Sequence, residues 1–236
     1  MHRRRAIRAL LVALSVAGCG REPGDPADRP SSTVRQQGEL VAGHSRAGVP
    51  THAERPMARR REAQVLLDSA FLLLGRAETA RATALVHRAA AFFLVQAGSP
   101  PSGGTTELLA VADSLDAIAG RLAHGTIVSR DALRSLSARG NLAEAERHGA
   151  LASVAWSTRS RESVADELLM AADHVERAAV DGDIRISPRM HLLLAEMREL
   201  AVAVPARPER DVQALDEPLS ELHLEIAVMR RALQPM

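Results

Sequence analysis

Three histidines lie within segments of helical periodicity and have apolar neighbours, so they are the residues best placed to bind a metal ion or haem. They are His87, His148 and His174. Helical bundles hold metals and haem with His and carboxylate side chains that point into the core. The pattern of a di-iron centre is missing, because the sequence has no pair of Glu-x-x-His motifs on separate helices.

The spacing of these histidines argues against a shared site. Glu144 and His148 are four residues apart on one helical face, which allows weak metal chelation or an ordinary surface pair. His148 and His174 stand at unequal distances from an expected turn near Thr158. At a rise of about 1.5 Å per residue, this inequality predicts an offset of about 7 Å between them along the helix axis. We therefore expect interface or surface histidines, with no resident metal and no cofactor.

No other arrangement typical of catalysis is found in the sequence. There is no Gly-x-Ser-x-Gly motif and no phosphate-binding Gly-rich loop. All 30 basic residues are Arg, so no Lys can serve as a Schiff-base nucleophile or a general base. Asp181-Gly182-Asp183 is similar to a fragment of a calcium loop but lacks the later ligands, and so predicts a helix-ending turn. We expect that the protein is not an enzyme.

Cys19, the single cysteine, follows a basic segment and a short apolar segment at the start of the chain. A basic region, an apolar run too short to span a bilayer and small residues before the cut describe a secretory signal peptide. The ending Val16-Ala17-Gly18-Cys19 resembles the lipobox of bacterial lipoproteins. This resemblance implies that residues 1–18 are removed and that Cys19 is lipidated as the new N-terminus. The alternative is ordinary signal cleavage, with Cys19 incidental.

The lipoprotein resemblance also implies a location in the cell envelope. In Gram-negative members of that family an Asp after the lipidated Cys favours the inner membrane, and here Gly20 follows Cys19. If the organism has an outer membrane, the resemblance therefore implies attachment there, facing the periplasm.

The composition of the processed chain excludes several kinds of site and partner. If Cys19 is lipidated, no thiol remains for disulfides, thiolate metal sites or nucleophilic catalysis. Removal of residues 1–18 takes away four Arg and no acid, which changes the formal net charge from +1 to about −3. That charge, together with a set of only 3 Phe and 1 Trp, argues against a nucleic-acid partner.

Residues 19–56 are expected to form a disordered tether, because Pro, Gly and charged residues interrupt any apolar periodicity. A flexible linker of this length has a root-mean-square span of about 35 Å. A basic cluster stands where the tether meets the next segment: Arg55, Arg59, Arg60 and Arg61. It is either an exposed first helical turn or a patch that attracts anionic lipid headgroups.

Residues 57–236 show helical periodicity nearly throughout and no alternation typical of strands. One segment has apolar residues at steps of three and four, as at a helix–helix seam: Leu108, Val111, Leu115, Ile118 and Leu122. Ser129, Ser187-Pro188 and Pro218 are expected to mark helix starts, whereas the first helix could continue past Gly75. The fold class predicted is all-α, an antiparallel bundle of about six to seven helices.

Two further patterns concern the origin of this bundle. Residues 108–116 are similar to residues 168–176, which is consistent with residues 77–124 and 138–181 being two copies of one helical hairpin, or with chance similarity between Ala- and Leu-rich helices. The phrase from Arg139 to Ala145 resembles the first helix of a tetratricopeptide repeat. Its spacing from a fainter copy at 74–80 does not match that repeat, so the family is not assigned.

These observations lead to one leading hypothesis and one alternative. The leading hypothesis is an exported, lipid-anchored helical bundle that acts as a binding or scaffold module at the cell envelope. Its partners would be membrane lipid, through acylated Cys19, and another protein. The alternative is a metal- or haem-binding sensor bundle that uses the inward histidines.

Overall fold

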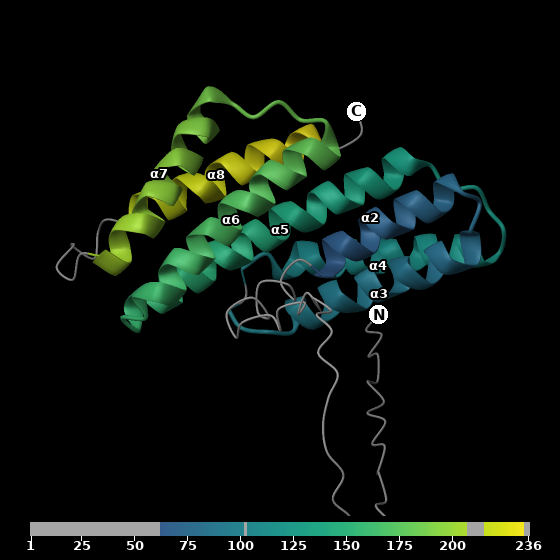
Figure 1. Cartoon of the computed structure of the whole chain (residues 1–236), viewed down its shortest axis with the longest axis horizontal. Helices are drawn as coiled ribbons and strands as arrows, with labels where there is room; N and C mark the ends of the chain where they lie inside the picture. The colour runs from purple at the N-terminus through teal and green to yellow at the C-terminus, as the bar shows by residue number, and fades with distance from the viewer. Residues whose placement is uncertain (1–61, 102, 207–214, 234–236) are drawn as a thin grey trace, which may run out of the picture. The chain divides into compact units, whose positions relative to one another are not determined.

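The computed structural model describes residues 62–101, 103–206 and 215–233, all within one compact unit, Gly48–Met236. These residues form seven helices and no strand, which confirms the predicted all-α bundle (Figure 1). The helices are α2 (Glu62–Gly75), α3 (Thr79–Ala97), α4 (Thr105–Ala123), α5 (Arg130–Ser157), α6 (Arg161–Gly182), α7 (Pro188–Ala206) and α8 (Asp216–Ala232). The predictions for the signal peptide, Cys19, the tether and the Arg55–Arg61 cluster lie outside the described residues.

The hairpin of α5 and α6 lies in the middle of this unit, with α7 and α8 on one side and α2, α3 and α4 on the other (Figure 1). Two groups of buried apolar residues follow from that arrangement. The α2–α5 core contains the predicted seam of α4 together with residues of α2, α3 and the first half of α5. The α5–α8 core contains residues of α6, α7 and α8 together with four residues of α5, Leu142, Ala145, Ala152 and Ala155. Helix α5 therefore contributes to both cores.

The predicted helix starts are confirmed at two serines. The backbone N–H of Asp131 donates to Ser129 Oγ at 3.1 Å before α5, and the N–H of Met190 donates to Ser187 Oγ at 3.0 Å before α7. These bonds satisfy amides that have no partner within the first helical turn. Helix α8 begins at Asp216, and Pro218 lies in its first turn.

The predicted option of one continuous helix past Gly75 is wrong, because α2 ends there and α3 begins at Thr79. Ala77 has a positive φ of 60°, which takes the chain out of the right-handed helical path. The backbone N–H of Glu78 then donates to Leu73 O at 2.9 Å and closes the turn.

Helix α5 is buried over most of its length although it carries many polar residues. Glycine permits close approach at one point of this helix, since a Cβ at Gly140 would lie 2.6 Å from Cζ of Phe93 on α3.

None of the described helices combines the length and the apolar character needed to cross a bilayer.

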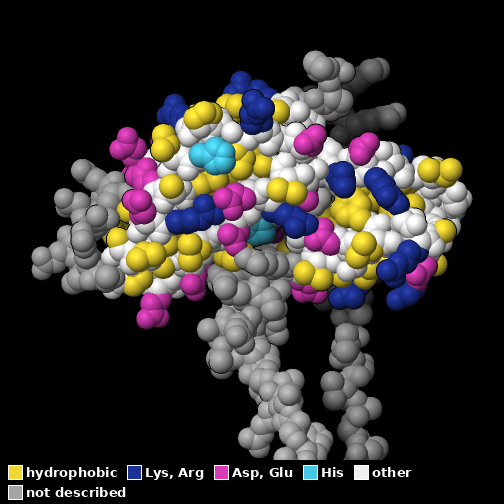
Figure 2. All heavy atoms as spheres, turned by 45° about the horizontal axis from the view of Figure 1, so that its top comes forward, with side chains coloured by type: hydrophobic (Ala, Val, Ile, Leu, Met, Phe, Trp, Pro, Cys, Tyr) yellow, Lys and Arg dark blue, Asp and Glu magenta, His cyan; other side chains and the backbone are white. Residues whose placement is uncertain are grey.

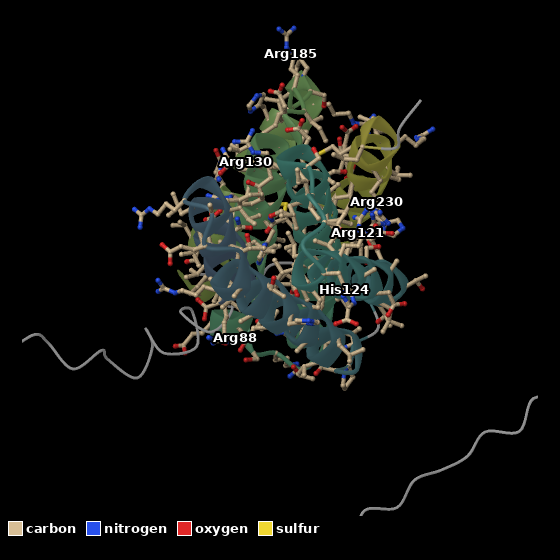
Figure 3. The ribbon with its side chains drawn as sticks, turned by 90° about the vertical axis from the view of Figure 1, so that its right-hand side faces the viewer. Arg88, Arg121, His124, Arg130, Arg185 and Arg230 are labelled. Carbon is tan, nitrogen blue, oxygen red and sulfur yellow. The ribbon has the colours of Figure 1, made fainter. Side chains whose placement is uncertain are left out.

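Surface charges of both signs are mixed, and several of them join neighbouring helices. On the face drawn in Figure 2, Arg and acidic side chains are interspersed among apolar ones. Arg230 of α8, labelled in Figure 3, donates two hydrogen bonds to the Glu146 carboxylate of α5, at 2.7 and 2.8 Å. Arg139 of α5 donates to Glu107 of α4 at 2.6 Å. These pairs attach α4 and α8 to the central helix.

Candidate metal centre

A line of polar side chains runs between α5 and α6, where an apolar seam would be expected. On α5 these residues follow steps of four, three and four, which keeps them on one helical face: Ser137, Asn141, Glu144 and His148. On α6 they recur every seven residues: Glu167, His174 and Asp181. All of them except Asp181 are buried, and the side chain of Asp181 is 9% exposed. The hairpin therefore encloses a buried polar seam rather than presenting it to solvent.

Side chains of α5 and α6 are hydrogen-bonded to each other across the seam. His148 Nδ1 lies 2.5 Å from Glu167 Oε2, and His174 Nδ1 lies 2.9 Å from Asn141 Oδ1. Farther along, Ser137 Oγ donates to Asp181 Oδ2 at 2.6 Å. Each pair satisfies buried polar atoms that would otherwise have lost their water partners.

The amide of Asn141 is oriented by its other contacts. Its Nδ2 donates to Gln64 Oε1 at 2.8 Å, to the Ser137 carbonyl at 3.0 Å and to Asp181 Oδ2 at 3.2 Å. Three acceptors around Nδ2 leave Oδ1 as the atom that faces His174. The Gln64 contact also joins α2 to the seam.

The hydrogen bonds at Nδ1 fix the tautomers of both histidines. Asn141 Oδ1 and the Glu167 carboxylate are acceptors, so Nδ1 of His174 and of His148 must each carry the proton that is donated. In the neutral rings the lone pair then lies on Nε2, which is the form of imidazole that ligates metals.

Three potential ligand atoms converge beside these rings. Glu144, His148 and His174 each offer one atom, and these atoms all lie within 4.8 Å of one another. His148 Nε2 is 3.9 Å from Glu144 Oε2, and the two imidazole rings stack with centroids 5.2 Å apart and planes at 12°. Two nitrogen ligands and one carboxylate oxygen are thus gathered at one point of the seam.

The carboxylate of Glu144 is the least compensated group at this point. Its side chain is 4% exposed, and its Oε1 is buried without a hydrogen-bond partner among the described residues. Burial raises its pKa to about 7, Arg147 opposes that shift and Glu167 adds to it. A buried carboxylate oxygen without a donor is costly, and a bound cation would compensate it.

The predicted offset between His148 and His174 is wrong, because their rings are stacked. His174 does lie about one turn farther from the α5–α6 connection than His148. Helical side chains lean toward the N-terminus of their own helix. In an antiparallel hairpin His148 therefore leans away from the connection and His174 leans toward it, which cancels the offset.

His148 and His174 are both buried at a helix interface. Glu144 and His148 are therefore not the surface pair that the sequence allowed. His87 of α3 is half exposed, and its Nδ1 lies 2.8 Å from Asp116 Oδ1 of α4. The structure therefore does not bring His87 to the cluster.

Sequence reasoning missed Glu167 and Asn141 as partners of the histidines. The signal that could have found them is a matched spacing of seven. Moving seven residues back along α5, from His148 to Asn141, corresponds to moving seven forward along α6, from Glu167 to His174. In an antiparallel pair of helices such residues stay opposite each other.

Two pockets border the cluster. One, of about 270 Å³, is lined by Gln96, Glu144, Arg147, His148, Leu151 and Glu167. The other, of about 340 Å³, includes Gln64, Asn141, His174 and Arg177 in its lining. The ligand atoms are thus buried but lie next to spaces through which a small ion can reach them.

No family model, curated protein or solved structure matches this chain, so its site is interpreted from its own residues.

Proposed function

We propose that this protein is a metal-binding module in which Glu144, His148 and His174 hold one divalent transition-metal ion. The observation that carries the proposal is the convergence of their three ligand atoms within 4.8 Å in a buried site. Imidazole suits zinc, copper, iron and nickel, and a set of two His and one carboxylate occurs in zinc and non-haem iron sites.

The surroundings of the three residues support this assignment. A histidine that ligates a metal usually donates its other N–H to a carboxylate or carbonyl oxygen, and here both Nδ1–H groups do so. In a tetrahedral site with bonds of about 2.1 Å, ligand atoms lie about 3.4 Å apart. The most widely separated atoms of this set, which lie up to 4.8 Å apart, therefore need to approach each other by about 1.4 Å, which side-chain rotations can supply.

The arrangement favours a single ion over haem. Two axial haem ligands approach the iron from opposite faces of the porphyrin, with their ring edges pointing at each other. The rings of His148 and His174 instead stack face to face with centroids 5.2 Å apart. That geometry leaves no space between them for a macrocycle.

Titration of the purified protein with Co²⁺ or Zn²⁺, followed by absorbance and calorimetry, tests the proposal. We expect one ion per chain for the wild type. His148→Ala and His174→Ala should each weaken binding by about ten-fold or more, as does loss of a metal-site contact elsewhere. His87→Ala is the matched control, because His87 lies outside the cluster, and it should bind like the wild type. Equal binding by all four proteins would contradict the proposal.

We also propose that the module is attached to the cell envelope through lipidated Cys19. The support is the lipobox-like ending Val16-Ala17-Gly18-Cys19 behind a basic and apolar segment. Cys19→Ser should abolish incorporation of labelled fatty acid and leave an uncleaved or mislocalised precursor. A mutant that is processed and fractionates like the wild type would contradict this attachment. The scaffold function and its protein partner stay predictions.

A further inference from the structure

We propose that the metal held by Glu144, His148 and His174 carries a small oxyanion as an additional ligand, and that Arg147 binds this anion in the adjoining pocket. This inference rests on the proposed metal-binding function. It assigns to the site a second ligand class, a small carboxylate or inorganic oxyanion, and it gives Arg147 a binding role.

Arg147 is a buried cation that forms no direct ion pair among the described residues, although its charge acts on the Glu144 carboxylate. Its residue is 9% exposed, and its Nε is buried without a hydrogen-bond partner in the part of the chain that the structure describes. The Nε of Arg230 is also without a hydrogen-bond partner among the described residues, but Arg139 and Arg230 each form an ion pair with a glutamate, at 2.6 and 2.7 Å. A charged group is costly to bury without a direct partner, so a guanidinium at this depth, compensated only at a distance by Glu144, favours an anionic ligand.

The pocket places Arg147 beside the metal ligands. Arg147 shares its lining with Glu144 and His148, and Gln96 of α3 adds an amide that can donate or accept a hydrogen bond. Its volume of about 270 Å³ falls just below the range of pockets that hold drug-sized molecules, about 300–1,000 Å³. The space therefore suits an ion of a few heavy atoms.

Coordination chemistry supplies the first reason for an anion. Three protein ligands leave at least one position open on a tetrahedral or octahedral ion. An oxyanion can fill that position with one oxygen and accept hydrogen bonds with another. The planar guanidinium of Arg matches the geometry of such a group and can bind it through two parallel hydrogen bonds.

The charges supply the second reason. A divalent cation and Arg147 bring positive charge to a site where Glu144 and Glu167 bring negative charge. With both glutamates ionised, the sum is about +1 when the metal is bound, and a buried net charge is unfavourable. One monoanion neutralises it. Without the metal, Arg147 and the two ionised glutamates leave a net charge of about −1, so anion binding should depend on the metal.

The test is an optical titration of the Co²⁺-loaded protein, because the visible spectrum of Co²⁺ responds to a new ligand. The protein is first titrated with Co²⁺ in a buffer without oxyanions, which measures metal binding alone. Acetate, bicarbonate and phosphate are then added separately. We expect a saturable spectral change with at least one of them, and the order of affinities distinguishes a carboxylate from an inorganic oxyanion.

Variants assign the effect to Arg147. Arg147→Gln should still bind one Co²⁺ per chain but lose about ten-fold or more of its anion affinity. Arg147→Lys keeps the positive charge but lacks the planar guanidinium, so its anion affinity should lie between those of the wild type and Arg147→Gln. It also provides a second test if Arg147→Gln does not fold. Arg134→Gln, at an exposed position on the same helix, is the control and should match the wild type in both titrations.

The outcomes separate the two proposals. A wild-type protein that binds no Co²⁺ would overturn both the metal site and the anion site. A protein that binds Co²⁺ but whose spectrum ignores all three anions would overturn the anion site alone. Anion affinity that is unchanged in Arg147→Gln would also overturn it, since the metal would then bind the anion without help from Arg147.

Discussion

Burial of the ionised Glu144 carboxylate is the main unfavourable contribution of this site to the stability of the fold. The carboxylate is buried, and desolvation raises its pKa from 4.5 to about 7. The unfolded chain releases that proton near pH 4.5, whereas the folded protein retains it to about pH 7. The ionisation of Glu144 therefore does not destabilise the folded protein below the lower pH and destabilises it fully above the higher one.

The free energy of unfolding of the metal-free protein should consequently fall as pH rises from 4.5 to about 7. The contribution of Glu144 to that fall is up to about 3 kcal/mol. Denaturant unfolding in the presence of a chelator measures it. Glu144→Gln should remove this part of the slope, and Glu162→Gln, at an exposed position on α6, should retain it. Identical slopes in the wild type and Glu144→Gln would mean that Glu144 ionises normally.

The sequence identified His148 and His174 as candidate metal ligands, but the predicted offset along the helix axis argued against a shared site. The error came from counting the rise along each axis without the lean of helical side chains toward the N-terminus. The partners at Nδ1 were missed for a different reason. Nothing in the sequence distinguishes Glu167 from an exposed acidic residue, and only the position of α6 against α5 shows that it is buried.

At the scale of elements, most helix limits could be predicted because they depend on local chemistry. Ser129 and Ser187 cap their helices through hydrogen bonds to backbone amides within three residues. The break after Gly75 could not be predicted in the same way. It depends on the positive φ of Ala77, a conformation that this residue type seldom adopts.

Close packing of α5 against α3 can be tested at Gly140. A Cβ there would lie 2.6 Å from Phe93 Cζ, and overpacking of this kind costs about 1–3 kcal/mol. Gly140→Ala should therefore lower the free energy of unfolding, even after the gain of about 1 kcal/mol that Ala brings to a helix.

Gly120 of α4 is the matched control, because a Cβ at that position would have no neighbour within 4 Å. Gly120→Ala should raise the free energy of unfolding by up to about 1 kcal/mol. Denaturant unfolding of Gly120→Ala and Gly140→Ala measures both changes in the free energy of unfolding. A stabilising effect of Gly140→Ala would show that α3 and α5 are farther apart than described.

At the scale of the whole described unit, α5 joins the α2–α5 core to the α5–α8 core. Because one helix contributes to both, we expect the two cores to unfold in one transition. Leu115→Ala empties a fully buried position in the α2–α5 core and should cost about 2–5 kcal/mol. Trp156, which packs against the α5–α8 core, should report the same lowered midpoint by fluorescence as circular dichroism does.

Separate midpoints for these two probes in Leu115→Ala would contradict the shared role of α5. Leu193→Ala, in the α5–α8 core, is the reciprocal variant, and it should lower the same single midpoint. The all-α class and the seam of α4 were predictable from periodicity alone. The contribution of α5 to both cores could not be predicted in this way. Many of its buried residues are polar, so a pattern of apolar residues does not show that the helix is buried.

The most direct test of the metal site is an anomalous difference map from a crystal soaked with Zn²⁺ or Co²⁺. We expect one strong peak within about 2.2 Å of the Glu144 carboxylate and of Nε2 of both His148 and His174. The same crystal form of His148→Ala should lose that peak. A map with no peak between α5 and α6, or with its strongest peak at His223 or another exposed histidine, would contradict the proposed metal site.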